Sequence, residues 1–375
     1  MKNGVWKLLL VILFVLAIVF GTLFIIDTSR MKNNKPVLFS TWGKKYSAPV
    51  ASADKMNVVL SLEDKIADDT VWCGTFNLIW NDLKNELAKK DIEFTPQLDV
   101  VRNLNKGTFN TEYLSEDSYY KVYGKPTIEL KKQIEKEIKR KFNETSDILD
   151  DFNWNESGDK DYLLYSMLKK EFEFPKVFDR LEKGKFKDWE NVKYFGIKKK
   201  TSEKVREQVK VLYYNSKEDF AIKLLTKSND EVIISRGNKA NTFGEIYAEI
   251  KENNENFKGS KNIEEDEIVK IPNIDFKLKK EFNEIEAKPF LFASGEEYVI
   301  EKAVQTIEFS LDEKGGRVKS EAGMTNKTTA LLPDLEPREF LVNDTFCIFL
   351  KEKDKELPYF AAKISDITQV QILGN

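Results

Sequence analysis

The chain has 375 residues, with 60 Lys and Arg against 63 Asp and Glu, two cysteines and no histidine. Without histidine it cannot use Ser-His-Asp or Cys-His catalysis, imidazole metal ligands or a histidine pH switch, although Ser-Lys and carboxylate chemistry remain open. The net charge of −3 gives no reason to expect nucleic acid as a partner, and 41% hydrophobic residues are too many for a disordered chain.

The N-terminal segment departs from the globular pattern. Residues 8–26 carry no charge, and as a helix they would span about 28 Å, close to the hydrocarbon thickness of a bilayer. A cleaved signal peptide is the alternative, but the end of the run, TLFIID, lacks a small-x-small cleavage site. We therefore expect an uncleaved signal-anchor at 1–30, a single-pass membrane protein with 8–26 in the lipid bilayer, and a tether at 31–55. The Lys and Arg after the run favour a cytoplasmic C-terminal part, but this rule is weak for long domains.

Two segments of the first half have apolar residues at helical spacing. The first, 71–90, predicts an amphipathic core helix. The second, 128–142, places isoleucines and a phenylalanine on one side and lysine and glutamate elsewhere. This pattern predicts a charged surface helix that lies on an apolar layer.

Strand patterns dominate from residue 161 onward. The apolar run 161–170 predicts a buried strand, and 208–236 predicts three strands separated by polar turns. A helix is expected at 242–252. A further strand is expected at 267–278, where Pro272 marks an edge or a bulge.

The C-terminal part has the clearest strand patterns. Residues 303–316 alternate apolar and polar side chains, which predicts a strand covered on one face and ended by two glycines. Residues 346–350 are continuously apolar and predict a strand buried on both faces, with 359–364 pairing back as a hairpin. Helices first and strands second, with no internal repeat, indicate an α+β fold.

Familiar chemical motifs are missing. The sequence has no Walker loop and no GxGxxG, and the acidic run 264–267 lacks the ligand spacing and the glycine of a calcium loop. Cys73 and Cys347 form no CxxC pair. They are either two buried thiols, which we favour, or one disulfide. We predict no catalytic residue, no metal site and no cofactor.

The segment 312–338 lies between two strong strand patterns and is too long for an ordinary connection. It contains a hidden alternation of side chains. The small or apolar members are Gly316, Val318, Ser320 and Ala322, and the charged members are Arg317, Lys319 and Glu321. Threaded into a sheet, this stretch would turn its small side chains inward and its charges to solvent. A plain mobile surface loop is the alternative explanation.

These residues resemble a known family, the serpins. The run EKAVQTIEFSLDEKGG at 301–316 is similar to the serpin strand that ends in the proximal hinge of the reactive-centre loop. Residues 336–364 are similar to the closing hairpin after that loop. Upstream, the resemblance continues through a strand-then-helix element, the central strand and the helix that crosses the main sheet, at 268–285, 161–186 and 134–151. It covers about 130–375 and implies one large serpin-like domain at 56–375 with large mixed and antiparallel sheets.

The resemblance implies a membrane-anchored inhibitor that traps a serine or cysteine protease as a suicide substrate through the loop 316–336. The cleaved loop would insert as a new strand before the protease deacylates. The implied hinge residues are Glu313, Gly315, Gly316, Val318, Ser320 and Ala322. The implied scissile region is Lys327, Thr328, Thr329, Ala330, Leu331 and Leu332. We expect no enzyme activity, a monomer and an extracellular domain.

Three features depart from the family pattern. The serine-rich motif of the sheet opening is not recognisable in 56–128, Thr345 stands where serpins have proline, and GRVKSEA replaces the alanine-rich hinge. The branched side chain of Val318 would slow insertion. The alternative function is therefore a non-inhibitory serpin-fold binding or surface protein. A Ser-Lys hydrolase is a third hypothesis, but Ser166 lacks the required spacing to a lysine.

Overall fold

The computed structural model describes residues 50–373 except 147, 155–160 and 318–336. The segment Ala51–Asn375 is a compact unit. The expected membrane span, 8–26, lies outside the described residues. In the part of the chain that is described, no helix has both the length and the apolar composition to cross a bilayer. This finding corrects the expected single-pass membrane localisation, which rested on hydrophobic length alone.

The architecture is α+β, with several sheets and few helices. One sheet has the order β1 (Ala51–Ser52), β13 (Ile274–Glu281), β16 (Val304–Asp312), β17 (Gly315–Gly316) and β6 (Phe172–Glu173). A second has the order β2 (Asn57–Val58), β3 (Thr70–Cys73), β20 (Phe360–Ile364), β19 (Phe346–Glu352), β11 (Asp230–Arg236), β10 (Asp219–Leu225) and β9 (Val209–Ser216). A third has the order β18 (Glu339–Leu341), β12 (Ile268–Pro272), β8 (Trp189–Ile197) and β7 (Asp179–Phe186).

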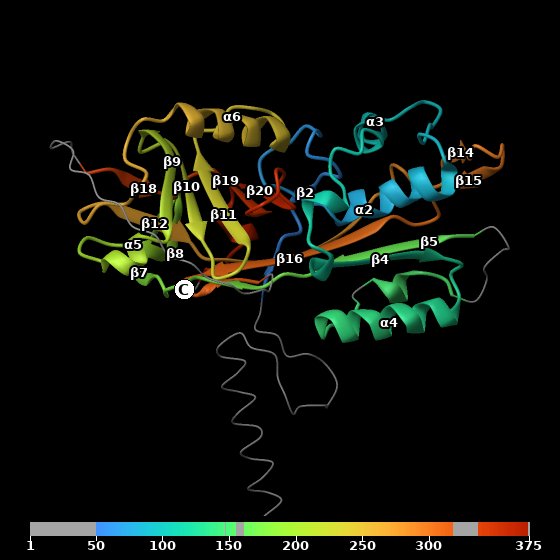
Figure 1. Cartoon of the computed structure of the whole chain (residues 1–375), viewed down its shortest axis with the longest axis horizontal. Helices are drawn as coiled ribbons and strands as arrows, with labels where there is room; N and C mark the ends of the chain where they lie inside the picture. The colour runs from blue at the N-terminus through green and yellow to red at the C-terminus, as the bar shows by residue number, and fades with distance from the viewer. Residues whose placement is uncertain (1–49, 147, 155–160, 318–336, 374–375) are drawn as a thin grey trace, which may run out of the picture. The chain divides into compact units, whose positions relative to one another are not determined.

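Two short sheets and the helices complete the described unit (Figure 1). The two-stranded sheets are β4 (Tyr119–Gly124) with β5 (Leu163–Leu168), and β14 (Pro289–Leu291) with β15 (Glu297–Val299). The α-helices are α2 (Thr75–Asp82), α3 (Asp99–Asn105), α4 (Ile128–Phe142), α5 (Glu203–Arg206) and α6 (Phe243–Asn256). A π-helical turn covers Leu83–Ala88, and 3-10 turns cover Thr111–Tyr113, Glu116–Ser118, Leu149–Asp151 and Ile367–Gln369.

Strands β11 and β19 form the buried centre of the seven-stranded sheet. Every residue of β11 is buried, and so are the first five residues of β19. The two strands are antiparallel, with Ile234 opposite Ile348. Both faces of this pair are covered, as the continuous apolar run predicted.

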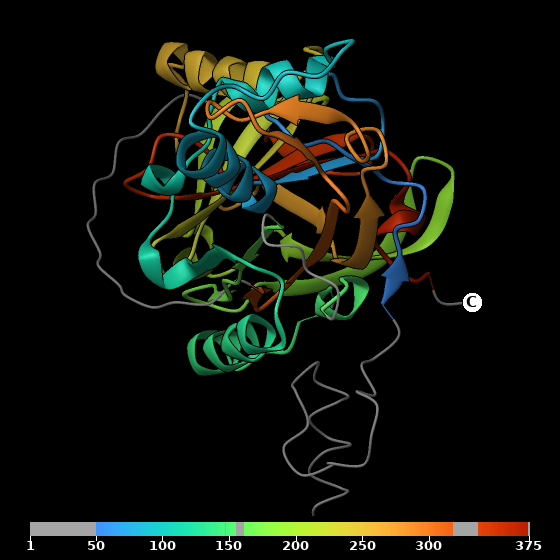
Figure 2. The ribbon, with the colours of Figure 1, turned by 90° about the vertical axis from the view of Figure 1, so that its right-hand side faces the viewer.

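Helices α4 and α6 each begin at a threonine that caps the first turn. The Thr127 hydroxyl accepts the backbone N–H of Leu130 and caps α4, whose Ile134 and Ile138 are fully buried. They lie in one hydrophobic cluster with Tyr165 of β5, so α4 covers the β4–β5 pair. In the same way Thr242 caps α6. Figures 1 and 2 show α4 and α6 on opposite sides of the described unit.

Three expected elements differ from the observed ones. The helix expected at 71–90 begins only at Thr75, because the preceding residues form the buried strand β3 against β20. The strand expected at 267–278 divides at Pro272 into β12 and β13, which belong to different sheets. Where the resemblance implies a helix after this strand, the hairpin β14–β15 follows instead.

Candidate functional site

The loop hinge is a tight turn between β16 and β17. The Asp312 carboxylate accepts the backbone N–H of Lys314 at 2.8 Å and that of Gly315 at 3.3 Å. Burial raises the pKa of Asp312, and these hydrogen bonds work in the opposite direction. After the turn Gly315 pairs back with Asp312, and Gly316 pairs back with Leu311. The chain therefore re-enters the sheet directly after β16.

The two glycines are required by the narrow space between β16 and β6. Gly315 has φ +153°, and a Cβ added there would lie 2.1 Å from the carbonyl oxygen of Phe172. A Cβ on Gly316 would lie 2.7 Å from the carbonyl oxygen of Ser310. Only glycine lets the backbone approach both neighbours this closely. The strand β17 is thus held between β16 and β6, pairing with both.

A buried carboxylate ties the hinge to the four-stranded sheet. Glu313 has 6% of its side chain exposed, and one of its oxygens accepts Nε and Nη2 of Arg180 at 2.8 and 2.6 Å. The Glu313 carbonyl oxygen also accepts the backbone N–H of Phe178 at 2.9 Å. These contacts satisfy the buried charge and hold the turn in place.

An arginine also holds the far end of the loop. Arg338 contacts both carboxylate oxygens of Glu267, through Nε at 2.5 Å and Nη2 at 3.0 Å. The same guanidinium donates to the backbone carbonyls of Ser260 and Asn262. It lies 5.4 Å from the ring centre of Phe340 in β18. The described residues on either side of 318–336 are therefore both held by ion pairs.

Next to the hinge, β5 and β16 are not paired with each other. β5 pairs with β4. β16 pairs with β13 from Val304 to Leu311, but with β17 only through Leu311 and Asp312. Among the described strands, none fills the position beside Val304–Ser310 on the β17 side. β17 pairs with β6, and β5 precedes β6 in the chain. A strand that continued β17 would therefore lie between β16 and β5.

The N-terminus of α2 lies beneath that position and contacts both flanking strands. Ser166 of β5 donates to the Thr75 carbonyl oxygen at 2.7 Å. Gln305 of β16 donates to the Thr75 hydroxyl at 2.6 Å and to the Cys73 carbonyl at 3.1 Å. The side-chain oxygen Oε1 of Gln305 is buried and has no hydrogen-bond partner among the described residues. Thr75 thus links β5 to β16, while the Gln305 side-chain oxygen remains an unsatisfied acceptor among the described residues.

The structure places only part of the expected site. It brings Glu313, Gly315 and Gly316 together in the hinge turn. The remaining expected hinge and scissile residues lie outside the described residues, namely Val318, Ser320, Ala322, Lys327, Thr328, Thr329, Ala330, Leu331 and Leu332. The roles of all these residues stay predictions.

Sequence reasoning missed the partners of the hinge. Arg180 and Arg338 carry no local signal, because their partners lie 133 and 71 positions away in the chain. Glu267 belongs to the acidic run 264–267, which lacks the spacing of a calcium loop, and its carboxylate accepts from Arg338. The sequence identifies Arg317 only as an outward-facing charge and gives no sign of its contacts with Glu171 and Glu308.

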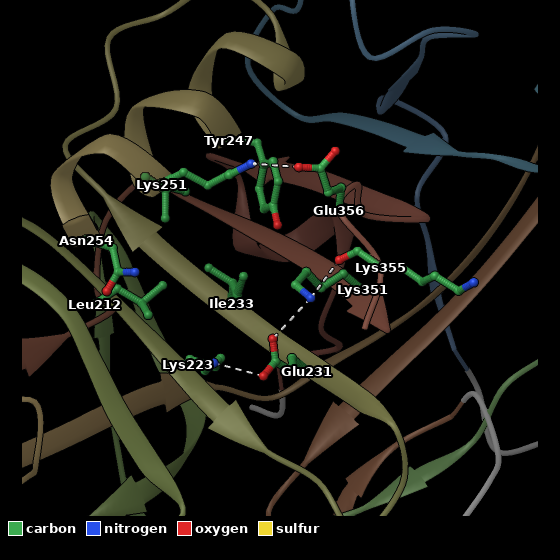
Figure 3. Close-up of a pocket in the computed structure, with 11 residues that line it drawn as sticks. Leu212, Lys223, Glu231, Ile233, Tyr247, Lys251, Asn254, Lys351, Lys355 and Glu356 are labelled. Carbon is green, nitrogen blue, oxygen red and sulfur yellow. Dashed lines mark hydrogen bonds and ion pairs between the residues drawn. The ribbon is translucent and has the colours of Figure 1, made fainter. Parts of the chain in front are cut away.

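A second feature is a groove of about 230 Å³ under α6 (Figure 3). Its apolar wall consists of Leu212, Ile233, Tyr247 and Ile250. Its charged rim consists of Lys223, Lys251, Lys351, Lys355, Glu231 and Glu356. Glu231 accepts Lys223 at 2.8 Å and Lys351 at 3.4 Å, and Lys251 lies 3.8 Å from Glu356. The rim therefore carries more positive than negative groups.

Comparison with known proteins finds no matching family model and no matching curated protein. Solved structures do match, and they share one fold. The structural neighbours of the chain are serpins. Serpin48, a highly specific serpin of the insect Tenebrio molitor, is 12% identical, with 68% of this chain and 78% of that chain covered and a TM-score of 0.37.

Thyroxine-binding globulin in complex with thyroxine is a second neighbour, 12% identical, with 63% of this chain and 64% of that chain covered and a TM-score of 0.40. Another structure, of the human globulin with thyroxine, is 10% identical, with 69% and 77% covered and a TM-score of 0.40. One neighbour is thus named as a highly specific serpin, and the other as a thyroxine-binding globulin.

Proposed function

We propose that this chain is a strand-inserting inhibitor that traps a serine or cysteine protease through the loop 316–336. The observation that carries the proposal is the partly occupied strand position beside β16. Two hinge residues, Gly315 and Gly316, already lie in it between β16 and β6. The rest of the position has no described strand.

The register of β17 supports the proposal. Leu311 pairs with Gly316, so an antiparallel continuation puts residue 318 opposite Phe309 and residue 320 opposite Ile307. On the other side Phe172 pairs with Gly316, which puts residue 322 next to Ser166. The facing residues of β16 at 305, 307 and 309 are buried, whereas Glu308 is exposed. The small side chains of the loop would therefore face the core and its charges would face solvent.

The trapping chemistry belongs to the protease. Its serine or cysteine nucleophile attacks a carbonyl carbon within 327–332, the peptide bond breaks, and the new amine leaves with a proton. The product is an acyl-enzyme, an ester or a thioester, which water would normally hydrolyse. Insertion of the cleaved loop would carry the bound protease away from the geometry that deacylation needs.

The test uses the purified full chain and a panel of serine and cysteine proteases. The expected result is an SDS-stable complex at the summed mass less the C-terminal fragment that cleavage releases, with the cleavage site mapping to 327–332. The melting temperature of the nicked protein should rise by roughly 10 °C or more, because an inserted strand adds several backbone hydrogen bonds at ~1 kcal/mol each. Cleavage with neither a complex nor stabilisation would contradict the proposal.

A second candidate function is a binding protein that does not trap proteases, and the groove under α6 favours it. An apolar wall with an excess of lysine at the rim suits a small amphipathic anion. In Figure 3 the Lys355 ammonium points away from the other labelled groups. Titration with anilinonaphthalene sulfonate tests this function. Binding that weakens in Lys251→Ala, but not in Lys355→Ala, whose ammonium points away from the groove, nor in Lys139→Ala on the distant helix α4, would support it.

A further inference from the structure

Arg317 continues β17 by one residue. Its backbone N–H donates to the Ser310 carbonyl oxygen at 3.2 Å, so its main chain is already part of the ladder with β16. Because side chains alternate along a strand, Gly316 faces the core and Arg317 faces the outer side of the sheet. Arg317 is therefore the first loop side chain that can hold the strand from outside.

The guanidinium of Arg317 bridges the two strands that flank the open position. Nε donates to Glu171, which lies between β5 and β6, at 3.0 Å. Nη1 donates to Glu308 of β16 at 3.3 Å. The side chain of Arg317 is 38% exposed and that of Glu171 is 25% exposed, so the first of these contacts is partly shielded from water. One side chain thus connects both sides of the opening.

Both carboxylates also have a second cation. Glu171 lies 3.3 Å from Lys169, and Glu308 lies 3.6 Å from Lys277. Burial raises the pKa of Glu171, but Lys169 and Arg317 outweigh burial and lower it, so the carboxylate stays ionised. Arg317 is therefore attracted to two preformed anionic sites that remain stable when it leaves.

We propose that Arg317 is a positioning residue that seats the start of the loop in one register between the flanking strands. A slip of one residue would turn the arginine into the core and every small loop residue outward. With the register fixed, the rest of the loop extends an existing strand. Its insertion then avoids most of the conformational entropy that starting a new strand would lose. The seating is independent of any protease, but its consequence for insertion rests on the proposed function.

The seating is measured by hydrogen exchange on the uncleaved full chain, in peptides that cover 313–317. Arg317→Gln and Glu171→Gln should each raise the exchange of these amides, by roughly three- to thirty-fold for the arginine, since partly exposed ion pairs are weak one at a time. The exchange rate of Arg317→Lys should lie between the rates of these variants and the wild type. Arg102→Gln is the matched control, because Arg102 forms an exposed pair with Asp99 in α3.

The second measurement is the rate at which a nicked loop stabilises the protein. Arg317→Gln should slow this gain by a similar factor. Unchanged exchange in Arg317→Gln, or a rise that Glu171→Gln does not share, would overturn the seating role. Raised exchange in both variants, combined with a wild type that gains nothing on nicking, would support the seating and reject the proposed function.

Discussion

Lys170 and Glu352 form an ion pair in the interior of the protein. The lysine Nζ lies 2.6 Å from a carboxylate oxygen of Glu352, and neither side chain is more than 3% exposed. Lys170 also donates to Asp230, which accepts the Tyr359 hydroxyl at 3.0 Å. This cluster joins the segment between β5 and β6 to the seven-stranded sheet.

Replacing Lys170 with methionine should destabilise the protein by about 3–5 kcal/mol, because two buried carboxylates would lose their cation. The free energy of unfolding in urea measures the effect. Lys227→Met is the control, since Lys227 forms an exposed pair with Glu173 and should change stability by no more than about 1 kcal/mol. Equal losses of unfolding free energy in both variants would show that the buried Lys170 pair contributes no more to stability than the exposed Lys227 pair.

Asp275 of β13 should make stability depend on pH. Burial, and then the nearby Glu308 and Asp312, raise its pKa from 3.8 to about 6. The folded state therefore holds this proton more tightly than the unfolded state, and the stability that Asp275 contributes at low pH is lost as pH rises from about 4 through 6.

Asp275→Asn removes this loss. The variant should be about 1–3 kcal/mol more stable than the wild type at pH 7, and the difference should disappear near pH 4. Urea unfolding at several pH values measures it. A difference that stays constant between these pH values would show that the Asp275 charge is not responsible.

Gly315→Ala should expel β17 from the sheet. The added methyl group would meet the Phe172 carbonyl oxygen at 2.1 Å, and φ is +153°. We expect a loss of about 2 kcal/mol or more and faster hydrogen exchange at Arg317. Gly295→Ala is the matched control. Gly295 also has a positive φ, +84°, but its added Cβ would meet nothing within 4 Å, so only the backbone cost of about 1 kcal/mol remains.

Neither cysteine should react with a thiol reagent in the folded protein. Cys73 and Cys347 are free and buried, and burial raises the pKa of Cys347 to about 12, which suppresses the reactive thiolate. Ellman's reagent should detect no thiol in buffer and two per chain in urea without reductant. Failure to detect two thiols in urea would indicate a disulfide.

Elements that depend on near neighbours in the chain were predicted well. The helix 128–142 has the expected bounds, because Thr127 caps its first turn and Asn143 ends it with φ +53°. The hairpin of β19 and β20 was also predicted, since a charged turn separates two apolar runs. In contrast, Val71, Trp72 and Cys73 were assigned to a helix, because a short apolar run fits a buried helix or a buried strand equally well.

The sequence by itself determined the α+β class and the glycine pair after β16, because each is a local pattern of side-chain size and polarity. Only the tertiary structure decided which charges meet. Arg338 reaches Glu267, Arg180 reaches Glu313, and Arg317 reaches Glu171, over separations of 71, 133 and 146 positions. In a chain with 63 acidic residues, spacing cannot select these partners, whereas the paired strands bring each of them to within 3 Å.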